Sequence, residues 1–96
     1  MNELEIEHLH ASLQQQLSAS ELARIKMKVV GPSGLSIQVD GERCLTSIGV
    51  WPNGCCDVDY LYAASEKGRF THFEFQSEQE AVSCVLREIR TAIDRA

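Results

Sequence analysis

Five short segments between residues 25 and 75 alternate apolar with polar side chains, which is the pattern of β-strands that bury one face. The segments are 25–29, 35–39, 43–51, 55–62 and 69–75. Short turns separate them, so successive strands are expected to be antiparallel neighbours in one sheet. The one-sided apolar patterns leave one face of this sheet covered and the other in water.

Glycine-containing turn signals lie between the predicted strands. Gly31–Gly34 ends the first strand, and Asp40-Gly41 is a two-residue hairpin signal after the second. Pro52–Gly54 turns the chain after the third strand, and Ser65–Gly68 does so after the fourth. The sequence therefore predicts a meander in which each strand pairs with the next.

The N-terminal segment is predicted to form an amphipathic helix. Apolar residues recur every three or four positions from Asn2 to Leu17, with Glu and Gln on the other faces. Ser18 and Glu21 have the spacing of a capping box, which favours one further helical turn. The helix therefore ends at Leu17 or continues to Ala23.

A second amphipathic helix is predicted after the last strand, where Ser77 and Glu80 form a capping box that opens a helix to about Asp94. The apolar stripes of the two helices contain Ile6, Leu9, Leu13 and Leu17, and Val82, Val85, Leu86, Ile89 and Ile93. Both stripes must be buried, so the helices are expected to lie side by side on one face of the sheet. We predict an α+β fold of order α-β5-α, with residues 1–96 forming a single domain.

The charge and composition of the chain exclude several function classes. Nine Lys and Arg against 14 Asp and Glu give a net charge of −5, which is the wrong sign for binding phosphates. No apolar run approaches the roughly 20 residues of a membrane span, and the acidic start at Met1–Glu5 does not match a secretory signal. We expect a cytoplasmic protein that binds neither nucleic acid nor a membrane. A basic protein suits its charge better, unless the acids serve only solubility.

Cysteines, metals and cofactors give no positive signal in the sequence. The four cysteines are Cys44, Cys55, Cys56 and Cys84. In a cytosolic protein we expect them to be free thiols, and their spacing lacks the CxxC pairs typical of zinc sites. His8 and His10 lie on neighbouring sides of the first helix, so they add no ligand pair. We therefore predict no metal site and, without a phosphate loop or dinucleotide motif, no cofactor.

The outward face of the last three strands combines aromatic and acidic side chains. These residues are Trp51, Asp57, Asp59, Phe70, His72 and Glu74. Aromatic side chains ringed by acids are typical of an interface with a basic protein. His72 among acids also fits an acid–base cluster, but an open strand surface excludes no water, so we predict binding and no enzymatic activity. The simpler alternative is that Trp51 only caps its hairpin or packs at the edge of the core.

Several motifs in this region occur in the order known from one protein family. They are Gly31-Pro32, Trp51-Pro52-Asn53-Gly54, the acids Asp57 and Asp59, the strand His72–Phe75, and Ser77-x-x-Glu80. From about Lys26 to Ile93 the chain resembles the TriTu-type immunity proteins of bacterial polymorphic-toxin and contact-dependent growth inhibition systems. The resemblance implies a leading helix, a central Trp-x-x-Gly hairpin with an acidic return strand, and a final helix.

The resemblance also implies a function, namely tight one-to-one binding of a cognate toxin domain that protects the producing cell. Many such toxins are nucleases with basic substrate channels, which an acidic protein can occupy. No catalytic residue is implied, and the free protein is expected to be a monomer. Two alternatives stay open: a small cytosolic adaptor or secretion chaperone, expected as a dimer with an apolar groove, and a small enzyme, which needs a pocket beside His72.

Overall fold

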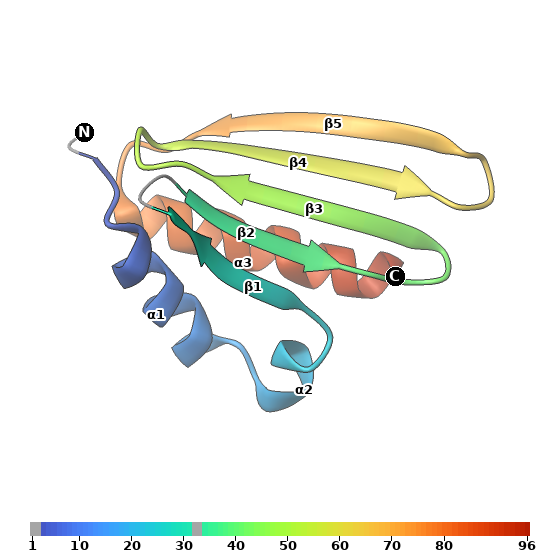
Figure 1. The fold of residues 1–96 in the computed structure, drawn as a ribbon, viewed down its shortest axis with the longest axis horizontal. Helices are drawn as coiled ribbons and strands as arrows, with labels where there is room; N and C mark the ends of the chain where they lie inside the picture. The colour runs from blue at the N-terminus through green and yellow to red at the C-terminus, as the bar shows by residue number, and fades with distance from the viewer. Residues whose placement is uncertain (1–2, 32–33) are drawn as a thin grey trace.

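The computed structural model describes residues 3–31 and 34–96, and its sheet is a five-stranded antiparallel meander in chain order (Figure 1). The strands are β1 (Lys26–Val30), β2 (Gly34–Val39), β3 (Cys44–Val50), β4 (Cys55–Tyr62) and β5 (Lys67–Glu74). The helices are α1 (Ile6–Gln16), α2 (Ala19–Leu22) and α3 (Glu78–Arg95). The predicted α+β fold of order α-β5-α is confirmed. Within the described residues, the helices lack the apolar stretch that spanning a bilayer requires.

The two long helices cover the same face of the sheet. α1 and α3 contact each other, and both contact β2. All residues of the predicted helical stripes are buried except Ile93, which is partly buried against the same core. They share this core with Ile37 of β2, Ile48 of β3 and Val58 of β4. We call the opposite side of the sheet, which none of the helices in the described residues covers, the outer face.

The first helix begins later than its sequence pattern predicts. α1 starts at Ile6, whereas the pattern placed the start at Asn2, which lies outside the described residues. Leu4 is buried in the core, and its backbone N–H donates to the Pro52 carbonyl at 2.6 Å. Residues 3–5 are therefore held against the turn between β3 and β4, and the helix begins only after them.

The chain after α1 forms a separate helical turn, α2, that is linked to α3. The Ser18 hydroxyl accepts from the Glu21 N–H at 3.1 Å, and the Glu21 carboxylate accepts from the Ser18 N–H at 2.8 Å, so the predicted capping box is present. Arg90 Nε donates to the same carboxylate at 2.9 Å, and its Nη2 donates to the Gln16 carbonyl at 3.2 Å. One carboxylate thus connects α2 with α3.

This arrangement predicts an acid-dependent loss of stability. The hydrogen bond from Arg90 and then that from Ser18 lower the pKa of Glu21 from its ordinary 4.5 to about 2. A lowered folded-state pKa contributes stability above pH 4.5 that is lost as the pH falls toward 2. We expect Glu21→Gln to lower the melting temperature at neutral pH, and the difference from the natural protein to shrink across that window. Glu7→Gln, in the exposed first turn of α1, is the control. A difference that stays constant with pH would contradict this assignment.

The connection between β2 and β3 is longer than the predicted Asp40-Gly41 hairpin. It runs over the four residues from Asp40 to Arg43. A side chain at Gly41 would collide with the backbone of Ala96, so the glycine allows the end of α3 to pack against this loop. Arg43 donates through Nη2 to the Asp94 carbonyl at 2.9 Å and through Nε to the Ala96 carbonyl at 3.0 Å. The prediction was wrong because this glycine is required for close packing and not for a tight turn.

The turn between β4 and β5 lies earlier than predicted, at Ala63–Glu66. Gly68 belongs to β5, where it pairs with Leu61 of β4. Within the turn, Glu66 adopts the left-handed backbone conformation, with φ +54°. The predicted turn at Gly31–Gly34 includes residues 32 and 33, which lie outside the described residues.

Candidate functional site

The outer face gathers the large exposed hydrophobic side chains of the described residues. They are Val30, Leu45, Trp51, Leu61 and Phe70. Strand register and burial place four of them on the side of the sheet opposite to the helices, and the ring of the fifth, Trp51, lies on that side over Gly49. Phe70 is 60% exposed. Single exposed apolar residues are ordinary, but several on one uncovered face mark a candidate binding surface.

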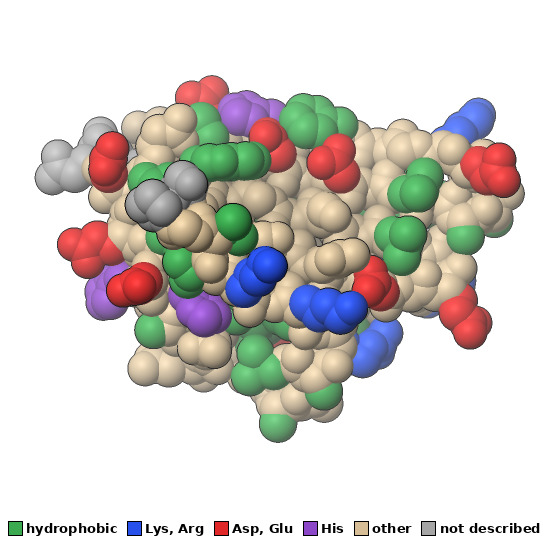
Figure 2. Space-filling model, viewed as in Figure 1, with side chains coloured by type: hydrophobic (Ala, Val, Ile, Leu, Met, Phe, Trp, Pro, Cys, Tyr) green, Lys and Arg blue, Asp and Glu red, His purple; other side chains and the backbone are tan. Residues whose placement is uncertain are grey.

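Charged side chains lie beside these hydrophobic ones, with opposite signs at the two ends of the sheet. The outward cross-strand pairs of β4 and β5 that contain charged residues or His72 are Cys55 with Glu74, Asp57 with His72, and Asp59 with Phe70. Lys26 and Lys28 point outward from β1 at the other edge. Figure 2 shows this division, with acidic and hydrophobic side chains over β4 and β5 and basic side chains over β1. A partner on this face meets an acidic and aromatic half and, at β1, two lysines of which Lys26 lies 3.6 Å from Asp40.

Trp51 lies at the end of this surface, in the turn that follows β3. Its N–H donates to the Cys55 carbonyl at 2.9 Å, and its own carbonyl accepts from the Gly54 N–H at 3.1 Å. Gly54 adopts φ +89°, as expected for a type I turn followed by a left-handed residue. The indole ring folds back over Gly49, where an added Cβ would lie 2.9 Å from ring atom Cη2. The ring therefore packs on the outer face, and Trp51 as a whole remains 39% exposed.

The contact between Trp51 and Gly49 predicts a spectroscopic effect. Gly49→Ala is expected to lift the indole off the strand, because the new methyl group occupies the place of the ring edge. Trp51 is the single tryptophan of the chain, so its emission maximum should move to longer wavelength as the ring becomes more hydrated. Ser47→Ala, the previous outward position on β3, is the matched control. Unchanged emission in Gly49→Ala would show that the ring does not lie over Gly49 in solution.

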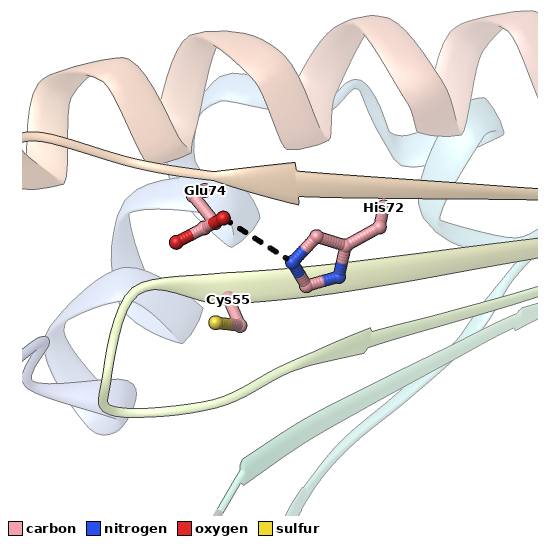
Figure 3. Close-up of side chains that lie close together, drawn as sticks. All are labelled: Cys55, His72 and Glu74. Atoms are coloured by element: carbon pink, nitrogen blue, oxygen red, sulfur yellow. Dashed lines mark ion pairs between the residues drawn. The ribbon is translucent and has the colours of Figure 1, made fainter.

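In the part of the chain that the structure describes, several reactive side chains lie close together around His72. Its Nδ1 lies 2.6 Å from Asp57 Oδ1, and its Nε2 lies 3.8 Å from Glu74 Oε2. Cys55, His72 and Glu74 each offer a ligand atom, and these atoms all lie within 4.8 Å of one another (Figure 3). The hydrogen bond with Asp57 raises the pKa of His72. The imidazole is 43% exposed, so solvent and ions reach it.

Sequence reasoning found three members of this cluster and missed Cys55. The adjacent Cys55 and Cys56 point to opposite faces of β4, and Cys56 is fully buried, which raises its pKa to about 12. Cys55 points outward, directly across from Glu74. The signal that could have found it is the register between β4 and β5, which is set by the Ala63–Glu66 turn that joins them. No spacing within one segment reveals such a cluster.

The six predicted site residues thus all lie on the outer face, but they do not form a single cluster there. Asp57, His72 and Glu74 come together with Cys55, while Asp59 and Phe70 form the next outward pair along the strands. Three hollows lie elsewhere, of about 710 Å³ between α2 and α3, about 380 Å³ beside the start of α1 and about 290 Å³ beside Trp51. A fourth, of about 230 Å³ between β5 and α3, is lined by Glu74 of the cluster, but His72 lines none of the four. Chemically, the cluster offers a thiol, an imidazole and a carboxylate at a surface open to water, which suits cation binding.

Comparison with known proteins finds no protein family, no curated protein and no solved structure that matches the chain.

Proposed function

We propose that this protein is an immunity-type inhibitor that binds a cognate bacterial toxin domain one-to-one through its outer face. The observation that carries the proposal is that the large exposed hydrophobic residues described above share one uncovered face with Asp57, Asp59 and Glu74. The class of partner is suggested by the resemblance of the Trp51–Asp59 hairpin to TriTu-type immunity proteins.

The expected partner surface is basic where it meets β4 and β5. Phe70 and Trp51 supply apolar area that binding removes from water, and Asp59 supplies a charge beside Phe70. Acidic side chains attract Lys and Arg from a distance and speed association, as the net charge of −5 also does. Lys28 repels a basic surface at β1, while Lys26 lies 3.6 Å from Asp40, so repulsion by Lys28 favours one orientation of the partner.

The proposal includes the place and state in which the protein acts. The toxin domain would be met in the cytoplasm of the producing cell, and the free inhibitor would be a monomer. Neither nucleic acid nor a membrane is expected as a partner, because net negative charge opposes binding to phosphates. A toxin with a basic nucleic-acid channel fits this charge best.

The test begins with the gene neighbourhood, where we expect a toxic C-terminal domain to be encoded beside this chain, and that domain is then co-expressed with it. We expect co-expression to restore growth, and light scattering on the purified mixture to give the mass of one copy of each protein. Growth arrest despite folded inhibitor, together with separate elution of the two proteins, would overturn the proposal. A stable dimer of this protein that does not bind the toxin domain would favour the adaptor or chaperone alternative.

A further inference from the structure

We propose that Cys55, His72 and Glu74 form an open, three-ligand zinc site on the outer face. The proposal does not depend on the toxin-inhibitor function, because it rests only on the side chains of β4 and β5. Thiolate sulfur, imidazole nitrogen and carboxylate oxygen are the ligand types that zinc takes in proteins. Calcium and magnesium prefer oxygen ligands alone, so this mixed set favours zinc.

The spacing of the three side chains fits this coordination after small side-chain movements. Zinc bond lengths imply ligand atoms roughly 3.3–3.7 Å apart in a tetrahedral site. His72 Nε2 and Glu74 Oε2 are already 3.8 Å apart, and all three ligand atoms lie within 4.8 Å of one another. The Glu74 side chain is 73% exposed, so it rotates freely toward a bound ion. Three protein ligands leave a fourth position for water or for a group from a partner.

The backbone holds these ligands at fixed positions. Cys55 and Glu74 are directly paired across β4 and β5, and His72 belongs to the neighbouring outward pair. Backbone hydrogen bonds continue past both strand ends, since the Phe75 N–H donates to the Gly54 carbonyl at 2.8 Å. Ligands on two paired strands need little ordering when the ion binds, which favours affinity.

Asp57 supplies the supporting contact that metal-binding histidines usually have. Its Oδ1 lies 2.6 Å from His72 Nδ1, so in the neutral imidazole Nδ1 donates to Asp57. The lone pair of the other nitrogen, Nε2, then points toward Glu74 and Cys55 (Figure 3). A carboxylate on the far nitrogen fixes the ring orientation and makes the imidazole a stronger ligand.

The first experiment titrates the purified, reduced full chain with zinc chloride in a calorimeter and with cobalt chloride in a spectrophotometer. We expect one equivalent of zinc to bind. Cobalt should give a thiolate charge-transfer band, which only a cysteine ligand produces. Added zinc should displace the cobalt and so remove this band. These readouts need no toxin domain, so a negative result here leaves the proposed function untouched.

Variants then assign the ligands. Cys55→Ser should remove the cobalt charge-transfer band, and His72→Gln and Glu74→Gln should each weaken zinc binding at least about tenfold. Asp57→Asn should weaken binding about 10- to 100-fold, as expected for a residue that orients a ligand. All four positions are exposed or half-buried, so the folded state should persist, and circular dichroism checks this.

Two control variants separate this site from general affinity for histidine and cysteine. His8→Gln removes another exposed imidazole that contacts a carboxylate, Glu78 at 2.8 Å, with no thiol in that contact. Cys84→Ala removes a thiol buried in the core. Both variants should keep the affinity for zinc and the cobalt band. The proposal is overturned if the natural chain binds no zinc, if Cys55→Ser or His72→Gln binds normally, or if His8→Gln abolishes binding.

Discussion

Replacing Val85 or Ile89 with aspartate is expected to unfold the protein. Both side chains are fully buried on the face of α3 that packs against the sheet. A carboxylate at either position has no charged partner in the apolar core, and burying it costs several kcal/mol. That cost is comparable to the roughly 5–15 kcal/mol by which a small domain is stable.

Circular dichroism and thermal melting test this expectation. Ser83→Asp places the same new charge on the exposed side of the same helix, and it should melt cooperatively near the temperature of the natural protein. Cooperative melting of Val85→Asp and Ile89→Asp at that temperature would mean that α3 faces the sheet through other residues.

The sequence predicted the layers of this fold because one physical requirement determines them. A strand with alternating apolar residues has one face to bury, and a helix with one apolar stripe has one side to bury. Ile48 and Val58 on paired strands and Leu13 and Ile89 on the two helices meet these requirements together in a single core. Local pattern and tertiary packing agree at these positions, so the architecture followed from the sequence.

Turn positions were predicted less well because glycine has more than one structural role. At Gly54 it supplies a positive φ, which is what a turn pattern assumes. At Gly41 it makes room for the end of α3, and at Gly49 it makes room for the Trp51 ring. Those roles depend on residues distant in sequence or on the rotamer of a neighbour, which no local pattern contains.

The candidate site shows the same division between local and non-local information. Alternation placed Asp57, His72 and Glu74 outward correctly. The approach of Cys55 to His72 depends on the register between β4 and β5, which is set by the Ala63–Glu66 turn that the sequence pattern misplaced. The face of the sheet on which a side chain lies was therefore predictable from the sequence, but the residue that it contacts across the strands was not.

Trp51→Ala is expected to weaken binding to the toxin domain by about 2 kcal/mol or more, which is roughly a 30-fold loss of affinity. The ring already packs on the outer face over Gly49, so a partner buries it with little further ordering. If Trp51 only shapes the hairpin, the loss should stay below about 0.5 kcal/mol. Isothermal titration of folded variants against the toxin domain distinguishes the two results.

Charge reversal at Asp59 tests the electrostatic half of the same interface. Asp59 is the cleaner probe, because Asp57 is half-buried and bonded to His72, so reversing Asp57 also disrupts the cluster. Asp59→Lys should slow association and reduce its dependence on salt, while the melting temperature changes little. Asp94→Lys makes the same change in net charge on α3, away from the outer face, and should leave the association rate nearly unchanged. Equal effects of the two reversals would indicate general attraction by net charge.

If neither Asp59→Lys nor Trp51→Ala has an effect, the contact surface lies elsewhere, with the acidic start of α1 around Glu5 and Glu7 the next surface to test.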